Sequence, residues 1–381
     1  EIGSGLVGSE MCIRDRIRVL HVLGAMNMGG IESFIMNTYR VIDRNRVQFD
    51  FLVNDEENKY AQEIGELGGH IYFIPPRNRG IKAYKTNIDR FFTEHREEFQ
   101  AVHLHAASLS SVYVLVAAKR YHIRTRIIHA HSTSIKGSKL HYVLHIFNKL
   151  RLKKIATHYF ACSDKAQHWM FDYTGRFAKS EVINNGILMK DFAYDEKKRG
   201  EIRKQLGIER DEIAICHVGS LTKVKNQSFL IDIFLQLKTI NPHYKLFMIG
   251  DGPLKSQLQE KIESLKIEDS VTFLGIRKDV HRLIQGFDCM VFPSLFEGLP
   301  VALVEAQASD LQVICSDTIS SMAKISDDTT FLSLSLSASD WAREIDKKLE
   351  GRKRKDNTEL IQKKGFSCDT VTKKLEKIYL D

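Results

Sequence analysis

The sequence predicts an α/β protein built from two successive doubly wound domains that face each other across a cleft. Two observations predict this class. From residue 17 onward, short apolar segments alternate with amphipathic segments of helical length, and a single polar stretch interrupts the alternation before it resumes. Strands that alternate with helices form βαβ units around a parallel sheet, and 381 residues are enough for two such sheets.

The N-terminal half supplies the first set of elements. After the first strand, the pair Gly29-Gly30 begins a helix that runs to about residue 39, and two further helices are expected at residues 108–120 and 138–154. The strands are expected at residues 17–23, 49–53, 71–74, 101–104, 126–129, 158–161 and 181–183.

The second set of elements follows a polar stretch at residues 191–207. Its helices are expected at residues 226–237, 253–265, 279–285 and 301–308, and its strands at residues 213–218, 244–249, 271–274, 289–292 and 312–315. We therefore place an N-terminal domain at 17–190, a C-terminal domain at 191–355 and a helical tail at 356–381 that can pack back on the N-terminal domain.

Residues 1–16 lack the long apolar stretch of a signal peptide. They resemble a translated adaptor scar, so we expect them to be non-native and the native chain to start near Ile17.

The bulk composition narrows the class of protein. Apolar residues make up 43% of the chain, and its apolar runs are far shorter than the roughly 20 residues that cross a bilayer. Six scattered cysteines without a C-x-x-C pair indicate a reducing cytoplasm. The net charge of +8 favours anionic partners, but the basic residues are not interleaved with a nucleic-acid recognition module, so no nucleic acid is expected.

Two glutamates stand eight positions apart near the end of the second set of elements. Glu297 precedes a Gly-Leu-Pro loop, and Glu305 lies within the first turns of an apolar helix. The N–H groups at the start of that helix favour negative charge, and two carboxylates can accept hydrogen bonds from several hydroxyls of one molecule. Solvated helix-start carboxylates are the alternative, which suits Glu297 better than Glu305. The segment predicts a nucleotide-sugar site.

Cations and glycines after other strands extend this prediction. Lys225 follows the Gly219 loop and precedes a helix, where its ammonium can neutralise a departing pyrophosphate. Lys223 beside it keeps open the alternative of a surface lysine. Gly29 and Gly30 allow close approach of a ligand to the backbone, or form an ordinary turn. The G-x-G-x-x-G dinucleotide fingerprint is absent.

Two histidine pairs end neighbouring strands. His103 and His105 share one face of their strand, and His129 and His131 repeat the spacing. Each pair could bind a metal or be structural, but no carboxylate or cysteine accompanies either pair, and the chain contains no Asp-x-Asp sequence. We therefore expect no metal and no cofactor.

Residues 136–154 carry six basic residues, no acidic residue and seven interleaved large apolar residues. Two interpretations stay open: a helix that lies on an anionic membrane surface, and a core-packed helix with a basic, solvated edge.

Six elements in order resemble the retaining glycosyltransferases of family 4, which have the GT-B fold of two Rossmann-like domains. The resemblance spans about residue 17 to the end, and the run Ser316-Asp317-Thr318-Ile319-Ser320 is similar to bacterial exopolysaccharide and capsule members. The six elements are Met28-Gly29-Gly30-Ile31-Glu32, His103-Leu104-His105, Asn185-Gly186-Ile187, Gly219 with Lys225-Asn226, Gly250-Asp251-Gly252-Pro253, and Glu297 to Glu305.

The resemblance implies roles for single residues. Glu297 and His105 contact the donor sugar, Lys225 meets its phosphates, and Glu305 binds the ribose hydroxyls; we take Glu297, His105 and Lys225 as the catalytic residues. The family usually has an arginine after Gly219, where this chain has Ser220. Three consequences stay open: Lys223 substitutes for the arginine, donor binding is weaker, or activity is impaired. The predicted donor-binding residues are Gly29, Gly30, Gly219, Ser220, Lys225, Gly298, Leu299, Pro300, Val301 and Glu305.

The predicted function is therefore that of a cytoplasmic, hexosyltransferase-type enzyme. It moves a sugar from a nucleotide-sugar, expected to be a UDP-sugar, to a hydroxyl of a lipid-linked glycan during surface polysaccharide synthesis at the inner face of the membrane. A nucleotide-sugar epimerase or a phosphorylase on the same architecture is one alternative. A non-catalytic GT-B partner is the other, which Ser220 and the departure from Gly-Leu-Pro at Asp310-Leu311-Gln312 keep open.

Overall fold

A computed structural model describes residues 16–27, 29–132, 138–297 and 299–381 of the chain. The expected adaptor scar, apart from Arg16, and the predicted donor-binding Gly298 lie outside the described residues. The chain divides into two compact units. The N-terminal unit runs to Gly186 and includes residues 368–381, and the C-terminal unit holds residues 187–367.

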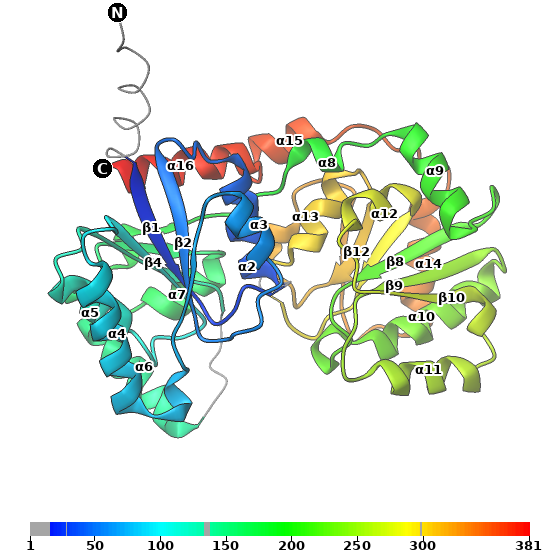
Figure 1. Cartoon of the computed structure of the whole chain (residues 1–381). Helices are drawn as coiled ribbons and strands as arrows, with labels where there is room; N and C mark the ends of the chain where they lie inside the picture. Colours follow the sequence, from blue (N-terminus) through cyan, green and yellow to red (C-terminus); the bar gives the residue numbers. More distant parts are fainter. Residues whose placement is uncertain (1–15, 28, 133–137, 298) are drawn as a thin grey trace, which may run out of the picture. The chain divides into compact units, whose positions relative to one another are not determined.

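The N-terminal unit is a parallel sheet with helices on both faces (Figure 1). In sheet order, its strands are β3 (Ile71–Phe73), β2 (Val47–Val53), β1 (Ile17–Val22), β4 (Ala101–Ala106), β5 (Thr125–Ala130), β6 (His158–Ala161) and β7 (Ser180–Val182). Its helices are α2 (Gly30–Val41), α3 (Ala61–Glu66), η1 (Arg77–Arg79), α4 (Ile81–His95), α5 (Tyr113–Arg120), α6 (Lys139–Arg151), η2 (Leu152–Lys154), α7 (Asp164–Phe171), η3 (Phe177–Lys179) and α16 (Cys368–Leu380).

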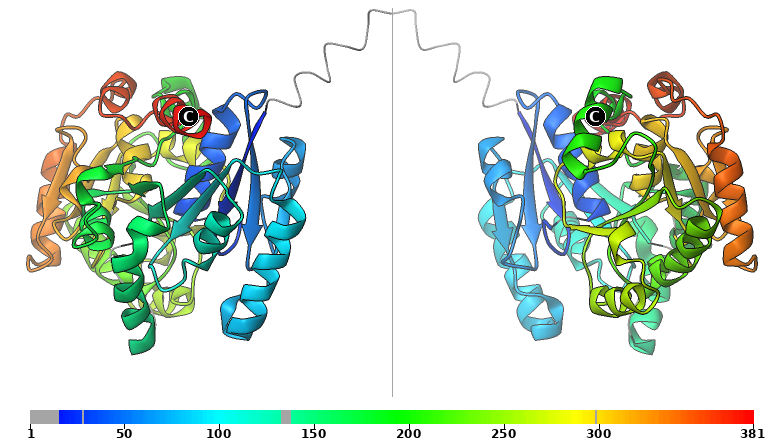
Figure 2. Two further views of the ribbon diagram at one scale, coloured as in Figure 1. Left: turned by 90° about the vertical axis from the view of Figure 1, so that its left-hand side faces the viewer. Right: turned by 90° about the vertical axis from the view of Figure 1, so that its right-hand side faces the viewer.

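Side chains that alternate along each strand fill two separate cores. On β1, Leu20 and Val22 face the core that α4, α5 and α7 cover, whereas Val19 faces the core under α2, α3 and α16. Helix α16 contributes Val371, Leu375 and Tyr379 to that second core, and Figure 2 shows it in red beside the blue α2. The last helix of the chain therefore completes the first sheet.

The C-terminal unit repeats the architecture (Figure 1). Its strands, in sheet order, are β10 (Val271–Gly275), β9 (Tyr244–Ile249), β8 (Ile213–Val218), β11 (Cys289–Phe292), β12 (Gln312–Ser316) and β13 (Thr329–Leu332). Its helices are α8 (Met189–Phe192), α9 (Glu196–Leu206), η4 (Lys223–Lys225), α10 (Gln227–Ile240), α11 (Lys255–Ser264), η5 (Glu268–Ser270), α12 (Val280–Gly286), α13 (Val301–Ala308), η6 (Ser321–Ala323), α14 (Ala338–Leu349) and α15 (Thr358–Lys363).

Local sequence explains where several helices begin and end. The polar stretch at 191–207 forms α9, because the Asp195 side chain accepts hydrogen bonds from the first-turn amides and Gly207 ends the helix in a left-handed conformation. Helix α14 begins with a capping box between Ser337 and Asp340.

Every strand expected from the sequence is present, and the prediction of two parallel α/β units is confirmed. One helix was predicted too long: the expected 108–120 begins only at Tyr113. Ser108 and Ser110 share a side-chain hydrogen bond of 2.9 Å, and the Leu109 amide donates to His145 Nδ1 at 3.1 Å. These bonds hold residues 108–110 in a turn instead of a helix.

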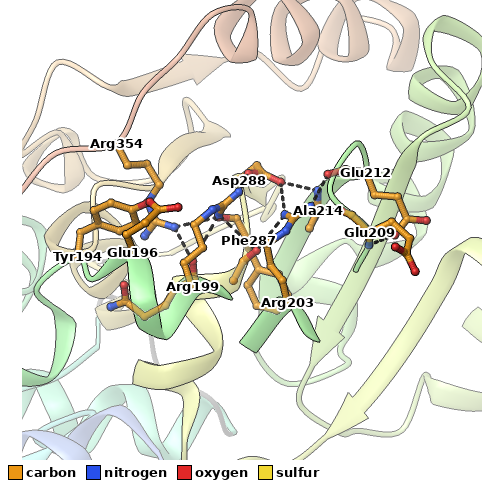
Figure 3. Close-up of polar contacts among 12 residues, drawn as sticks. Tyr194, Glu196, Arg199, Arg203, Glu209, Glu212, Ala214, Phe287, Asp288 and Arg354 are labelled. Atoms are coloured by element: carbon orange, nitrogen blue, oxygen red, sulfur yellow. Dashed lines mark hydrogen bonds and ion pairs between the residues drawn. The ribbon is translucent and has the colours of Figure 1, made fainter. Parts of the chain in front are cut away.

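An arginine cluster stabilises the edge of the C-terminal unit where its strands begin (Figure 3). Arg199 and Arg203 of α9 form ion pairs with Asp288, which also accepts from the Ala214 amide at 2.7 Å. Arg354 donates to the carbonyls of Gln285 and Phe287 at the end of α12. A cavity of about 520 Å³ opens beside this cluster. We assign it no ligand, because its best-placed guanidinium groups already bind protein carbonyls and Asp288.

Candidate active site

The first part of the candidate site is the loop that leaves β11 in the C-terminal unit. Parallel strands end at one edge of their sheet, and β8 lies beside β11, so the loops after these two strands are neighbours. Two hydrogen bonds fasten them together: the Leu295 amide donates to the Val224 carbonyl at 2.8 Å, and Asn226 Nδ2 donates to the Pro293 carbonyl at 3.1 Å. Asn226 adopts a left-handed conformation that asparagine tolerates well.

This fastening brings together two of the predicted catalytic residues. Lys225 Nζ lies 2.6 Å from Glu297 Oε1, and 4.6 Å from the centre of the Phe292 ring. The two charged side chains are 17% and 19% exposed, so a ligand can reach them. The pair is internally neutral, and an anionic ligand would compete with Glu297 for the ammonium group.

Glu305 is the fifth residue of α13, about one turn from its start, and is half-buried. Its carboxylate forms no hydrogen bond or ion pair with any described residue, and burial raises its pKa to about 7. A half-buried carboxylate without a partner is unfavourable, and hydroxyl groups of a ligand would relieve that. This is the feature expected of a binding carboxylate and not of a solvated one.

The start of α13 offers a second kind of group. Pro300 precedes the helix, and no side chain caps it. The Leu303 amide donates to the Pro300 carbonyl at 3.1 Å, so the amides of Val301 and Ala302 are the ones that point out of the helix end, where they suit an anion or a hydroxyl oxygen. The side chains of Leu299 and Pro300 are buried, so these two predicted donor-binding residues would contact a ligand through their backbone.

Glycines shape the loop after β8. A Cβ atom at Gly250, whose φ is +134°, would lie 2.1 Å from the Gly219 carbonyl oxygen, and one at Gly252 would lie 2.5 Å from the Leu221 carbonyl oxygen. The 219–221 backbone can therefore lie directly on the 250–252 backbone only because both positions lack side chains. Ser220, in the place of the usual arginine, is exposed, and so is Lys223.

In the N-terminal unit, Gly29 precedes α2 and Gly30 is its first residue. A Cβ atom at Gly29 would lie 2.4 Å from Glu32 Oε2, so the Glu32 carboxylate folds over this helix end, and burial raises its pKa. An acid already occupies the position that favours negative charge. A phosphate at Gly29-Gly30 would have to displace it.

His105 belongs to a buried cluster of five histidines on β1, β4 and β5. Parallel register places His21 beside His103 and His105 beside His129. His105 Nε2 is 3.0 Å from His21 Nδ1, and His105 Nδ1 is 2.9 Å from His131 Nε2. His103 bonds both His129, at 3.2 Å, and the Tyr379 hydroxyl of α16, at 2.7 Å.

Burial lowers the pKa of every member of this cluster, to about 3 for His21 and His131 and well below the usual value for the other three. The imidazoles are therefore neutral at pH 7, and each can donate one hydrogen bond and accept another. Two groups of three, His21 with His103 and His105, and His105 with His129 and His131, have nitrogens within 4.8 Å of one another. This geometry could hold a transition metal, but the hydrogen bonds between the rings are enough to explain why the nitrogens lie so close together.

Comparison with known proteins adds family membership. Residues 28–189 match the family described as Glycosyltransferase Family 4, and residues 198–364 match Glycosyl transferases group 1. The chain is 35% identical over 334 residues, 86% of each protein, to EpsF of Bacillus subtilis (strain 168), which is named as a glycosyltransferase.

The chain belongs to the family-4 glycosyltransferases.

Two further relatives bear on the fold and on the ligands discussed below. An Escherichia coli UDP-Gal:alpha-D-GlcNAc-diphosphoundecaprenol alpha-1,3-galactosyltransferase is 25% identical over 321 residues, 79% of this chain and 80% of its own. The crystal structure of Anabaena HepE in complex with UDP and glucose matches with a TM-score of 0.75 at 18% identity, over 95% of this chain and 99% of its own. The fold of the glycosyltransferase is therefore GT-B, as predicted.

Each unit of the glycosyltransferase adds residues that the sequence did not single out. His21 could have been found, because it ends the strand next to β4 and shares its face with Val19. Tyr379 carried no signal, since only the return of α16 brings it to His103. His217 of β8 was also missed; it is buried under Gly219, bonds the Val291 carbonyl at 3.0 Å, and burial lowers its pKa to about 4.

Proposed function

We propose that the protein is a retaining glycosyltransferase that moves a sugar from a UDP-sugar to a hydroxyl of a lipid-linked glycan. The observation that carries the proposal is the arrangement at the strand ends of the C-terminal unit. A reachable Lys225–Glu297 pair lies in the same pair of loops that leads to an uncapped helix start and an unpartnered Glu305. HepE, with the same fold, binds UDP and glucose, which supports a UDP-sugar as donor.

The ion pair gives the donor site a simple exchange. When the diphosphate of the donor arrives, the ammonium of Lys225 turns from Glu297 to the phosphate oxygens, to which it contributes a charge-assisted hydrogen bond. Glu297 is then free to accept hydrogen bonds from hydroxyls of the sugar. Glu305 accepts from the ribose hydroxyls. Phosphate charge is met by Lys225 and by amides at the start of α13, so no metal or other cofactor is needed.

The reaction itself then needs few protein groups. The bond between the anomeric carbon and the diphosphate oxygen breaks, and the acceptor oxygen bonds the same face of that carbon, so the configuration is retained. The acceptor proton passes to the leaving diphosphate oxygen, whose developing charge Lys225 stabilises. His105 is neutral, so it does not act as a fixed cation, and it can donate to the sugar only by giving up its bond to His21 or to His131.

The acceptor and its setting follow from the family and from a named relative. A relative with 25% identity uses a diphosphoundecaprenol-linked acceptor, which supports a lipid-linked glycan, surface polysaccharide synthesis and a position at the inner face of the membrane. Among the described residues, no helix is long and apolar enough to span a bilayer.

The direct test is a screen of nucleotide-sugars, scored by released nucleotide, with Glu297→Gln and Glu305→Gln beside the unmodified protein. We expect a UDP-sugar to be turned over and both variants to be impaired; full turnover by either variant would overturn the assignment of that residue. A UDP-sugar incubated without acceptor should be hydrolysed slowly, whereas formation of its epimer would refute the transferase. Calorimetry with UDP adds a last check, because no heat at millimolar ligand would favour the non-catalytic partner that Ser220 keeps open.

A further inference from the structure

Helix α6 has its polarity reversed relative to an ordinary surface helix. Its exposed side carries Leu140, Val143 and Leu150, which are 61%, 60% and 63% exposed. Its buried side carries His145 and Lys149, which bond the Leu109 amide and the Trp169 carbonyl. An amphipathic helix normally turns its apolar side to the core. Of the two interpretations that the sequence left open, a core-packed helix with a solvated basic edge does not describe α6.

The exposed apolar side chains form one surface. Of the fifteen large hydrophobic residues that are exposed in the described chain, six lie on this helix of 13 residues. We call them the α6 surface: Leu140, Tyr142, Val143, Ile146, Phe147 and Leu150. Apolar side chains gathered in this way mark a binding surface, whereas single exposed ones are normal. In Figure 1 the helix lies at the outer edge of the N-terminal unit, away from β1.

An exposed tyrosine adds an independent observation. Tyr173 follows α7 with a φ of +63° and a side chain that is 92% exposed. A left-handed conformation is unfavourable for a bulky residue and is often retained at functional positions. Lys149 of α6 reaches toward it, with Nζ 6.0 Å from the ring centre. Tyrosine, with an apolar ring and a polar hydroxyl, is favoured where membrane meets water.

The charged residues of the segment that forms the α6 surface have one sign. Residues 136–154 contain no acidic residue. Lys139, Arg151 and Lys153 are exposed at the two ends of the helix, and the Arg151 guanidinium lies 5.0 Å from the Phe147 ring centre. Long basic side chains can leave their aliphatic stems beside apolar residues while their charges reach lipid headgroups.

We propose that the α6 surface docks the protein on an anionic lipid bilayer, with its apolar side chains in the headgroup region and its cations on lipid phosphates. A second copy of the chain fits less well, because a symmetric contact would bring the same cations face to face. An anionic bilayer offers both hydrocarbon and the opposite charge. The inference deepens the proposal of a lipid-linked acceptor, but it rests on exposure and charge in the N-terminal unit alone.

The test is flotation with vesicles of phosphatidylcholine, with or without phosphatidylglycerol. The full chain should float with the anionic vesicles, less so at high salt, and remain unbound with neutral ones. Val143→Ser/Phe147→Ser/Leu150→Ser should weaken binding by roughly tenfold or more, since each of these side chains gives up buried apolar area. A matched control, Phe73→Ser/Ile81→Ser/Ile240→Ser, removes three apolar side chains that are 38%, 55% and 43% exposed elsewhere, and should bind like the unmodified protein.

Three results would overturn the inference. They are failure of the unmodified protein to bind anionic vesicles, equal binding by the α6 variant, and a dimer in light scattering that the α6 variant alone dissociates. The donor assay keeps this test apart from the proposed function. The α6 variant should release nucleotide from a UDP-sugar in water at the unmodified rate. Absence of turnover by the unmodified protein, with its binding to anionic vesicles intact, would concern the transferase proposal only.

Discussion

The two units share one architecture, but their strand ends hold opposite kinds of chemistry. In the C-terminal unit, the loops after β8 and β11 carry a charged, reachable ion pair and a carboxylate without a partner. In the N-terminal unit, β1, β4 and β5 end in five neutral imidazoles that mainly bond one another. Similar sheets can therefore offer either ionised groups that a ligand re-pairs or neutral groups that mainly bond one another, although Nε2 of His21 and Nε2 of His129 have no partner among the described residues.

The two units should differ most in stability at acidic pH, where we expect the largest of the predicted effects. Each cluster histidine has a folded pKa far below the unfolded value of 6.5, so its contribution to stability is present above pH 6.5 and is lost as the pH falls. One pH unit is worth about 1.4 kcal/mol per proton, so five histidines remove roughly 7 kcal/mol one unit below that value. This rivals the whole stability of a domain, at about 5–15 kcal/mol.

Hydrogen exchange followed by mass spectrometry on the full chain, at pH 7.5 and at about pH 5.5, should measure this loss of stability separately for each unit. After correction for intrinsic exchange rates, peptides of β1, β4 and β5 should lose protection before peptides of β8 and β11. His217 contributes the same effect to the C-terminal unit, but as one group against five. Simultaneous loss in both units, or none in either, would remove the contrast.

The second prediction concerns the charged side of the comparison. Lys225→Gln and Glu297→Gln should each lower kcat/KM for the donor by roughly a hundredfold to a thousandfold, the loss typical when a group that stabilises developing charge is removed. Thermal unfolding should move little, because both side chains still reach water, at 17% and 19% exposure, and ion pairs in contact with solvent contribute about 0–1 kcal/mol. Lys223→Gln is the matched control and should retain most activity. A large drop in melting temperature would mean that the pair is structural.

The sequence predicted the fold and the pairing of these loops for identifiable reasons. The strands are short, buried and apolar, and Glu297, Lys225 and the glycines stand at strand ends, where parallel topology gathers them. Other features depend on contacts that no local pattern encodes. Asp310, which departs from the family pattern, is buried and accepts from the Lys355 amide and Asn357 Nδ2, both at 2.7 Å. Tyr379 reaches His103 only because the chain returns to its first sheet. The reversed side of α6 likewise follows from which residues find hydrogen-bond partners, not from hydropathy.

Glu305 gives a third, smaller effect, with a pH dependence opposite in origin to that of the histidines. With its pKa near 7, the carboxyl is partly protonated at neutral pH, and ribose hydroxyls donate better to the ionised form. Donor binding should lower this pKa, so the affinity for UDP should rise with pH through about 7, by up to roughly tenfold if the pKa falls by one unit. Calorimetry across that range should show the rise in the unmodified protein and a flat profile in Glu305→Gln. A rise that persists in the variant would assign the titration to another group.

Ser220→Arg tests the smallest expected effect and asks whether the charged site is complete. The arginine that the family usually carries here is absent, and Ser220 is exposed beside a loop that leads to Lys225. Because a new cation at an exposed position gains about 0.2–1 kcal/mol, the affinity for UDP should rise only a few-fold, and the rise should shrink with added salt. Ser220→Gln controls for the longer side chain. If Ser220→Arg changes nothing while Lys223→Gln weakens UDP binding, Lys223 already supplies the second positive charge. If neither substitution changes UDP binding, the ammonium of Lys225 and the amides at the start of α13 are sufficient. The departure from the family at Ser220 then has no bearing on donor binding.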